Sequence, residues 1–398
     1  MAYRGGTVGA LAPFGLFLAG VAWLALSGAP DERGFWPVLL AALTLGLLLA
    51  RDRHAWAEAV AAFILCAVVS TATGTSLGTL LLCAPLLYPA GAALGTAPAV
   101  LMGAILGGAT FGDNISPVSD TTIASATTQG AEIGAVVRTR LRYALPAATM
   151  AIVATALLGG GGTPAGSTGL GAGGPRALLM LAAPALVLGL LLTRRHLLEG
   201  LLFGCAAAAL LGVAGGLIEP HRLLWLDLES FTARGLVIEG VERGIGVSIF
   251  TLLLMGLVAG LEASGLVERL VRRAEASATS PAAAEVRAVA ATSAAVILTT
   301  HSVVALLAVG PFVRRVGERL GLAKERRANL LDLTVCIWPF LLPYCIPTIL
   351  ASSLSATGAE AGMPRLAAWQ VGLANAHSWA LAVLLVVAVS TGYGRRRG

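Results

Sequence analysis

Long apolar runs separated by short polar segments dominate the chain. Uninterrupted runs occur at 8–28, 35–50, 141–159, 176–193, 197–217, 247–266 and 367–392. Because about 20 residues of helix cross the hydrocarbon core of a bilayer, runs of this kind are typical of membrane-spanning helices. Two further regions, 57–128 and 284–354, are apolar but interrupted. The pattern therefore predicts an all-α polytopic membrane protein with about 10–12 transmembrane helices.

The two interrupted regions predict breaks in their helices. Residues 57–89 would extend roughly 50 Å as one helix, well beyond a hydrocarbon core of about 30 Å. The expected break points are "TATGTS", with Gly74, and "GDNISP", with Gly112 and Pro117. Glycine relaxes the backbone, and proline removes an N–H donor. Broken helices expose carbonyls and helix ends, from which many transporters build a site at the membrane midplane.

The interrupted regions also match each other at a constant spacing of 226 positions. The matched pairs are Thr73 and Thr299, Ser76 and Ser302, Pro85 and Pro311, Pro117 and Pro343, and Thr122 and Thr348. One unbroken offset over roughly a hundred residues indicates an internal duplication.

The charges of two equivalent connections predict that the repeat is inverted. Residues 90–98 carry no charge, whereas 314–327 hold six basic residues and two glutamates. Because cytoplasmic loops collect Lys and Arg, these connections are expected to face opposite sides of the membrane. A simple count of spans gives a parallel repeat instead. Inversion then requires a re-entrant hairpin in one interrupted region, or an extra excursion by 218–246, which could form an interfacial helix.

We therefore expect four segments along the chain, with the two repeats meeting at a central site through broken helices or re-entrant hairpins. They are a first repeat half at 1–158 with its core motif region at 57–158, a Gly-rich linker at 159–175, connecting helices and an interfacial stretch at 176–246, and a second repeat half at 247–398.

Composition supports a membrane protein and excludes several other classes. Charged residues are 12% of the 398, about half the usual share for a water-soluble fold. The net charge of +6 does not indicate nucleic-acid binding, because the arginines lie at the ends of apolar runs, where they signal orientation. These are Arg51, Arg53, Arg138, Arg140, Arg142, Arg194, Arg195 and Arg395 to Arg397. We expect a multi-pass protein of the cell (inner) membrane with cytoplasmic termini, whose first run is retained rather than cleaved.

Other motifs favour a transporter over an enzyme. The five cysteines lie in apolar segments without a CxxC pair, which suggests packing rather than metal or disulfide chemistry. No HExxH, GxSxG or Walker loop occurs, so no enzymatic activity and no cofactor are expected. Oligomeric state stays open, with a homodimer as one possibility.

The stretch "FGDNISPVSDTT" (111–122) is the strongest candidate site. Hard cations prefer oxygen ligands, and an ionisable residue inside a membrane is a functional candidate by default. The candidate ligands for a cation or proton are Asp113, Asn114, Ser116, Asp120, Thr121 and Thr122, with Asp113 and Asp120 as the Na⁺-binding carboxylates. We expect an unwound backbone at Asp113, next to Gly112.

A second set could bind the ion or a substrate: Thr73, Thr75, Ser76, Thr299, Thr300, His301, Ser302 and Asp332. The alternative for the hydroxyl residues is ordinary hydrogen bonding within and between helices. His301 lies at a break and could be a ligand or a structural residue. His377, in the last run, is better explained as structural.

Two motifs resemble a known family. The segment "GATFGDNISPVSDTTIASATTQGAEIGAVVRTRLRYALPAA" (108–148) is similar to the signature of the NhaC family of sodium/proton antiporters. "ATGTSLGT" (72–79) resembles that family's upstream motif, with Leu77 where tryptophan is more usual. The resemblance implies inverted repeats with broken helices or hairpins, and sodium or proton coupling through residues 112–122. The second half departs from the family's commonest form, and some members are thought to carry organic anions or amino acids.

Two transport hypotheses follow. In the first, the protein is a secondary active Na⁺/H⁺ antiporter that exchanges cytoplasmic Na⁺ for H⁺ at a midplane site of carboxylates and hydroxyls. In the second, it is a Na⁺- or H⁺-coupled transporter of a small organic solute, an amino acid or a carboxylate. The aspartates would then hold the coupling ion, while His301 and the neighbouring hydroxyls would hold the solute.

Overall fold

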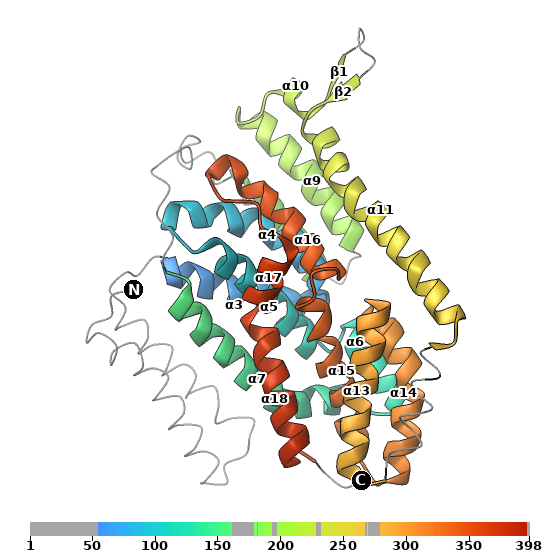
Figure 1. Ribbon diagram of the computed structural model, residues 1–398. Helices are drawn as coiled ribbons and strands as arrows, with labels where there is room; N and C mark the ends of the chain where they lie inside the picture. The colour runs from blue at the N-terminus through green and yellow to red at the C-terminus, as the bar shows by residue number, and fades with distance from the viewer. Residues whose placement is uncertain are drawn as a thin grey trace, which may run out of the picture. The chain divides into compact units, whose positions relative to one another are not determined.

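The computed structural model describes residues 55–160, 179–180, 182–192, 197–227, 232–266, 269 and 279–395 (Figure 1). Several sequence predictions fall outside these residues. They are the spans at 8–28 and 35–50, residues 161–175 of the Gly-rich linker, and the arginines at 51, 53, 194, 195, 396 and 397. The described chain is helical apart from one pair of short strands, which agrees with an all-α membrane protein.

One compact unit comprises the described residues within 1–165 and 258–398, and so contains both interrupted regions. Its helices in the first half are α3 Ala55–Thr73, α4 Ser76–Leu94, α5 Pro98–Ile115, α6 Asp120–Gln129 and α7 Ile133–Leu158. Its helices in the second half are α13 Pro281–Thr299, α14 Ser302–Arg319, α15 Lys324–Val335, α16 Ile346–Leu354, α17 Ala368–Ala374 and α18 Ala376–Thr391, with 3₁₀ turns at Trp338–Phe340 and Ser355–Ala361.

The helix boundaries repeat at the spacing found in the sequence. Helices α3, α4, α5 and α6 begin at 55, 76, 98 and 120, and α13, α14, α15 and α16 begin at 281, 302, 324 and 346. Every start in the second set lies 226 positions after its counterpart. The two sets also pack in a reciprocal way, since α6 packs against α14 and α15, while α16 packs against α4. These observations support the internal duplication.

Each repeat begins with a helical hairpin. Helix α3 packs against α4, and α13 packs against α14 (Figure 1). Gly74 at the first turn has φ +70° and Thr300, its counterpart at 226 positions, has φ +56°. Both residues are therefore left-handed, a conformation that glycine adopts freely and that is uncommon for threonine. The expected break at "TATGTS" thus occurs at Gly74 and Thr75, as a turn between two packed helices.

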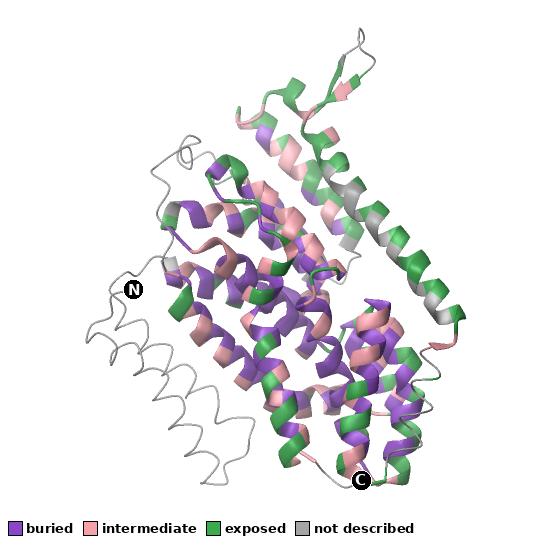
Figure 2. Cartoon of the chain, in the orientation of Figure 1, coloured by how far each residue is buried: buried purple, intermediate pink, exposed green. Residues whose placement is uncertain are grey.

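Helix α5 forms the centre of this unit and is buried along nearly its whole length (Figure 2). Small residues allow this burial. A side chain at Gly108 would collide with the backbone of Phe63, and one at Gly112 would collide with Ala67 and Ser70 on α3. The hydroxyl of Ser70 donates a 2.6 Å hydrogen bond to the carbonyl of Ala109. The first hairpin is therefore fixed closely against the helix that carries Asp113.

Only some of the described helices are long and apolar enough to cross a membrane. Trp56–Thr73, Ile133–Leu158 and Pro281–Thr299 are long and apolar enough to cross a bilayer, and α17 with α18 forms a further candidate that is bent by 55°. The bend corrects the expectation of one continuous run at 367–392. It occurs at Asn375, whose side-chain oxygen caps α18 by accepting a 3.3 Å hydrogen bond from the N–H of Ser378, while its amide donates to the carbonyl of Phe340 at 3.2 Å.

The second unit, residues 166–257, contains helices α8 Ala182–Leu192 and α9 Leu197–Ala214, which pack together. The stretch 218–246 is not one continuous helix, and its position at the membrane interface stays a prediction. It contains the single turn α10 Pro220–Leu223 and an antiparallel pair, β1 Trp225–Asp227 with β2 Thr232–Arg234, before α11 Leu236–Ala263 begins. Aromatic and β-branched residues such as Trp225 and Thr232 suit short strands.

Two of the arginines used as an orientation signal have a different role. Arg326 and Arg327 are buried on α15 rather than exposed in a loop. Arg326 binds both carboxylate oxygens of the fully buried Glu285 on α13, at 2.9 and 3.0 Å, and Arg395 binds the same carboxylate at 2.8 Å. The charge bias of 314–327 therefore rests on fewer residues than the sequence suggested, and inversion of the repeat stays a prediction.

Cysteine labelling can test this inversion. Leu94 and Leu320 are counterparts at the ends of α4 and α14, and neither is buried. In a Cys205→Ser background, which removes the one exposed cysteine among the described residues, we expect Leu94→Cys and Leu320→Cys to react with an impermeant maleimide from opposite sides. Labelling of both from the same side would rule the inversion out.

Candidate functional site

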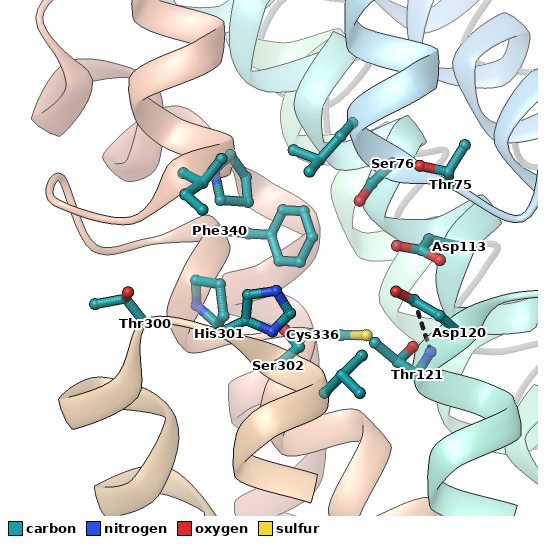
Figure 3. Close-up of a pocket in the computed structure, with 15 residues that line it drawn as sticks. Thr75, Ser76, Asp113, Asp120, Thr121, Thr300, His301, Ser302, Cys336 and Phe340 are labelled. Atoms are coloured by element: carbon teal, nitrogen blue, oxygen red, sulfur yellow. Dashed lines mark hydrogen bonds between the residues drawn. The ribbon is translucent and has the colours of Figure 1, made fainter. Parts of the chain in front are cut away.

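The two hairpin turns meet at a cavity of about 110 Å³ in the centre of the first unit (Figure 3). The breaks between α5 and α6 and between α15 and α16 complete its walls. It is lined by Thr75, Ser76, Leu77, Asp113, Asp120, Thr121, Thr300, His301, Ser302, Val303, Cys336, Pro339, Phe340, Ile346 and Pro347. By volume the cavity can hold several waters or a small solute.

The lining follows the internal repeat. Six residues of the first repeat have their 226-spaced counterparts in the same lining: Thr75 and His301, Ser76 and Ser302, Leu77 and Val303, Asp113 and Pro339, Asp120 and Ile346, and Thr121 and Pro347. Equivalent backbone positions therefore surround the cavity from both repeats, while their side chains differ. The first repeat supplies two carboxylates and three hydroxyls, and the second supplies an imidazole, hydroxyls and a mainly apolar surface.

Asp113 is the buried carboxylate of the cavity, with 6% of the residue exposed. It lies in the last turn of α5, and its Oδ1 accepts a 2.6 Å hydrogen bond from Ser119, whose hydroxyl lies 3.1 Å from that of Thr121. The expectation of an unwound backbone at Asp113 is wrong. Gly112 permits close packing on α3 instead of breaking the helix, and the break begins at Ser116, just before Pro117.

Asp120 lies at the opposite end of the same break, as the first residue of α6. Its side chain is exposed towards the cavity, and one oxygen accepts a 2.8 Å hydrogen bond from the backbone N–H of Thr121. A negative charge is favourable at a helix N-terminus. The break at 116–119 thus brings two aspartates that are seven positions apart to one cavity.

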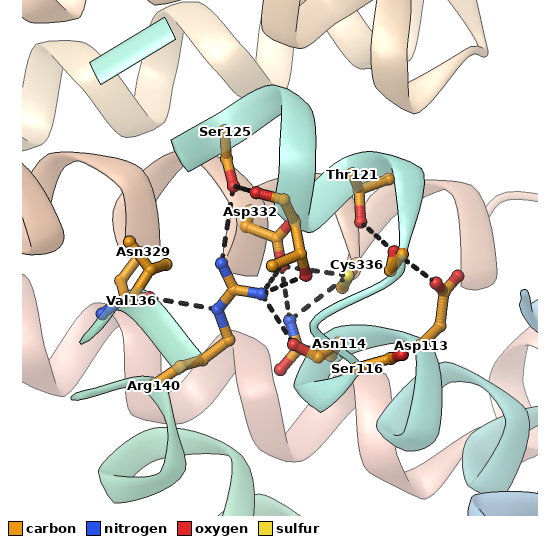
Figure 4. Close-up of polar contacts among 12 residues, drawn as sticks. Asp113, Asn114, Ser116, Thr121, Ser125, Val136, Arg140, Asn329, Asp332 and Cys336 are labelled. Carbon is orange, nitrogen blue, oxygen red and sulfur yellow. Dashed lines mark hydrogen bonds and ion pairs between the residues drawn. The ribbon is translucent and has the colours of Figure 1, made fainter. Parts of the chain in front are cut away.

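Behind this wall, the fully buried Arg140 of α7 organises a polar network (Figure 4). Its Nη1 lies 2.7 Å from a carboxylate oxygen of Asp332 and donates to the carbonyl of Asn114 at 2.6 Å and to the hydroxyl of Thr122 at 2.7 Å. Its Nε donates to Asn329 at 3.0 Å. Arg140 therefore joins α5, α6 and α15 and is not the exposed orientation signal that the sequence suggested.

Three candidate ligands belong to this network rather than to the cavity. Asp332 is neutralised by Arg140 and accepts a 2.9 Å hydrogen bond from the amide of Asn114. Thr122 is engaged by Arg140, and none of the three lines the cavity. Their side chains hold the break between α5 and α6 in place, which is a positioning role.

Three hydroxyl candidates also make local hydrogen bonds and do not line the cavity. Ser116 donates to the carbonyl of Thr71 at 2.8 Å, which ties the break to the first hairpin. Thr73 donates to Ser70 at 3.5 Å, and Thr299 donates to the carbonyl of His301 at 3.3 Å. For these residues the structure favours the alternative of ordinary hydrogen bonding within and between helices.

The turn of the second hairpin presents its polar side chains differently. His301 occupies the N-cap position of α14 without capping it, and its exposed imidazole lines the cavity. Ser302 donates to the carbonyl of Val335 at 3.3 Å, and Thr300 donates to that of Thr299 at 2.7 Å. His377, by contrast, is fully buried between Phe63 and Phe111, at ring distances of 6.0 and 5.5 Å. It is outside the cavity lining, as expected for a structural residue.

Sequence reasoning missed Phe340, Cys336 and the role of Arg140. The repeat gave no signal for the first two, because their counterparts at 226 positions, Asn114 and Thr110, do not line the cavity. Among the described residues, no group of three His, Cys, Asp or Glu side chains could hold a metal ion. Any cation bound by Asp113 and Asp120 would therefore need hydroxyl or backbone oxygens as further ligands.

The carboxylate wall lies in a part of the chain that matches a known family. The model of the Na⁺/H⁺ antiporter family matches residues 40–160. The malate-2H⁺/Na⁺-lactate antiporter of Bacillus subtilis (strain 168) is 35% identical over 100 residues, which are 25% of this chain and 21% of that protein. The Na⁺/H⁺ antiporter NhaC of Alkalihalophilus pseudofirmus is 44% identical over 64 residues, which are 16% of this chain and 14% of that protein.

The chain matches only about a fifth or less of the length of either relative, so these two matches do not extend over the whole protein. Residues 40–160, which the family model matches, contain the first hairpin, α5, α6 and α7. The resemblance to the NhaC-type Na⁺/H⁺ antiporter family, inferred from residues 72–79 and 108–148, is thereby confirmed, and this is a membrane-embedded protein with that family's signature in its first repeat.

Proposed function

We propose that the protein is a secondary active antiporter that exchanges Na⁺ for H⁺. The observation that carries the proposal is the cavity between the two repeats, where Asp113 and Asp120 lie together with the hydroxyls of Ser76 and Thr121. Carboxylate and hydroxyl oxygens are suitable ligands for a hard cation that has lost part of its water. The match of residues 40–160 to the Na⁺/H⁺ antiporter family supports the same reading.

Exchange follows if Na⁺ and H⁺ compete for the same carboxylates. A site that holds either ion, but not both, moves one against the other when access alternates between the two sides of the membrane. The buried Asp113 with its Ser119 hydrogen bond would be the inner ligand. The exposed Asp120 would receive the ion first.

A second candidate function is the coupled transport of a small organic solute. It is favoured by the unlike second wall, where His301, Ser302 and Phe340 line the cavity. One relative is itself named as an antiporter of malate and lactate. In this alternative the aspartates hold the coupling cation and the second repeat contacts the solute.

Purified protein in proteoliposomes with an acidic interior and a pH-sensitive dye tests the first proposal. We expect added Na⁺ to dissipate the pH gradient, with Li⁺ and K⁺ as comparison ions. If none of the three ions moves protons faster than in empty liposomes, inorganic cation exchange is refuted. Uptake of labelled malate, lactate or an amino acid that needs a Na⁺ or pH gradient would favour the second candidate.

His301→Ala distinguishes a ligand from a structural residue. Because its imidazole is exposed to the cavity and does not cap α14, we expect normal protein abundance but an altered pH profile or solute preference. Abundance in membranes and transport across a pH series are the two measurements. Unchanged transport kinetics at normal abundance would show that the imidazole contacts nothing that is transported.

A further inference from the structure

We propose that the cavity also accepts small organic ammonium ions, which it exchanges for protons at the same carboxylates that are proposed to bind Na⁺. The inference rests on the proposed cation/proton exchange and extends it to a second class of cation. It comes from the chemical difference between the two walls of the cavity.

The first observation is that the second repeat has apolar side chains at the positions where the first repeat has oxygen ligands. Asp113, Asp120 and Thr121 of the first repeat are matched in the lining by Pro339, Ile346 and Pro347. A bare metal ion gains nothing from hydrocarbon, since its coordination shell is made of oxygens. A cation that carries methyl or methylene groups would place them against this surface and keep its charge near the carboxylates.

The second observation is an aromatic ring opposite the carboxylates. Figure 3 shows Phe340 on the far side of the cavity from Asp113, and the residue is only 4% exposed to solvent. An aromatic face attracts organic cations, and desolvated sites of this kind recognise quaternary ammonium groups. A carboxylate on one side and an aromatic ring on the other is therefore a suitable arrangement for an alkylated ammonium group.

The position of Phe340 is well fixed. It ends the 3₁₀ turn Trp338–Phe340 after α15, and its carbonyl accepts the hydrogen bond from Asn375 at the bend between α17 and α18. The indole of Trp338 in the same turn donates a 2.8 Å hydrogen bond to Ser293 on α13. These bonds fix the backbone that carries Phe340, and the ring itself is buried, so it can contribute to binding without a large cost of ordering it.

Charge favours an ammonium group over an organic anion. The described lining contains the carboxylates of Asp113 and Asp120 and one histidine, but no lysine or arginine. Arg140, which contacts the motif in the described network, is already paired with Asp332. An anion would meet two carboxylates without a fixed positive partner. The volume of about 110 Å³ restricts the class to small ions such as tetramethylammonium.

The test uses the full-length protein in proteoliposomes, with tetramethylammonium as the probe. This ion keeps its charge at every pH, so it cannot cross as a neutral base and collapse the pH gradient by itself, as primary amines do. Choline belongs to the proposed class, so sucrose rather than choline should balance the osmolarity. We expect tetramethylammonium to dissipate the pH gradient only in protein-containing liposomes, and to compete with Na⁺.

Phe340→Leu removes the aromatic face and keeps an apolar side chain. We expect the half-maximal concentration of tetramethylammonium to rise about tenfold, which corresponds to about 1.4 kcal/mol and lies within the range of cation–π contacts. The value for Na⁺ should change less than about twofold. Phe312→Leu on α14 is the matched control, because Phe312 is buried in the apolar core away from the cavity lining. It should leave the ratio of the two values unchanged.

The outcomes separate this inference from the proposed function. Dissipation by Na⁺ but not by tetramethylammonium overturns the inference and leaves Na⁺/H⁺ exchange in place. Dissipation by tetramethylammonium alone supports the inference and removes Na⁺ as the substrate. Equal shifts for both ions in Phe340→Leu would show that the ring only supports the fold of the site, and would also overturn the inference.

Discussion

Asp113→Asn is expected to abolish cation-dependent proton movement while the protein still reaches the membrane. The substitution keeps the size of the side chain and its ability to accept the hydrogen bond from Ser119, but removes the charge and the titratable proton. Asp113 is buried in the cavity wall, so no bulk water can replace its charge around a bound cation. The measurement is dissipation of a pH gradient by Na⁺, Li⁺ and K⁺ in everted vesicles across a pH series.

Asp120→Asn is also expected to impair cation-dependent proton movement strongly, although for a different reason. Asp120 is exposed at the start of α6, so we expect the half-maximal cation concentration to rise about tenfold or more, equal to at least about 1.4 kcal/mol of binding free energy. Glu318→Gln is a suitable control, since it neutralises an exposed carboxylate on α14 that pairs with Arg314 and Arg327 and does not line the cavity. If both aspartate variants kept the wild-type rate, affinity and pH profile, the coupling site would have to lie elsewhere.

Much of the architecture could be predicted because the duplication preserved spacing. Hydrophobic runs and the 226-residue offset placed both hairpins and the position of the break at Pro117. Two repeats that fold alike place their matched residues at equivalent positions. Ser76 and its counterpart Ser302 accordingly both line the cavity between the repeats. This argument needs only the chain's own periodicity.

The parts that could not be predicted depend on tertiary packing. An arginine near the end of an apolar run is usually an orientation signal, and nothing local distinguishes Arg140 from its neighbours Arg138 and Arg142. Only the approach of α15 supplies Asp332 and makes burial of Arg140 tolerable. Likewise, a glycine at 112 could indicate a break in α5 or a close contact with another helix. The structure shows the close contact, because α3 packs directly against Gly112.

The same packing explains why a hydroxyl-rich motif mixes two roles. Of the candidates in residues 111–122, Asp113, Asp120 and Thr121 face the cavity, whereas Asn114 and Thr122 face Arg140. A break in a helix at membrane depth frees backbone carbonyls, which must find donors inside the protein. Arg140 satisfies the carbonyl of Asn114, and its positive charge suits the C-terminal end of α5. The network therefore stabilises the break in a buried helix.

Arg140→Met is expected to be the most destabilising single change in the described site. It leaves the carboxylate of Asp332 without its ion-pair partner in a fully buried position, and loss of one partner of such a pair costs about 3–5 kcal/mol. Asp332→Leu should be similarly harmful, because it leaves the buried guanidinium unpaired. Abundance in membranes and the melting temperature in detergent are the measurements.

The double variant Arg140→Met with Asp332→Leu separates charge burial from positioning. Removing both charges should recover much of the lost stability, since replacement of a whole buried ion pair by apolar residues is often tolerated. Transport should recover far less, because a methionine at this position could not hold the carbonyl of Asn114 or the hydroxyl of Thr122, on which the placement of Asp113 and Asp120 depends. A double-mutant cycle on the exposed ion pair Arg314 and Glu318 is the matched control. The expected coupling free energy between these two residues is about 0–1 kcal/mol. Additive effects of the two buried substitutions would contradict the ion pair, and full recovery of transport would contradict the positioning role of Arg140.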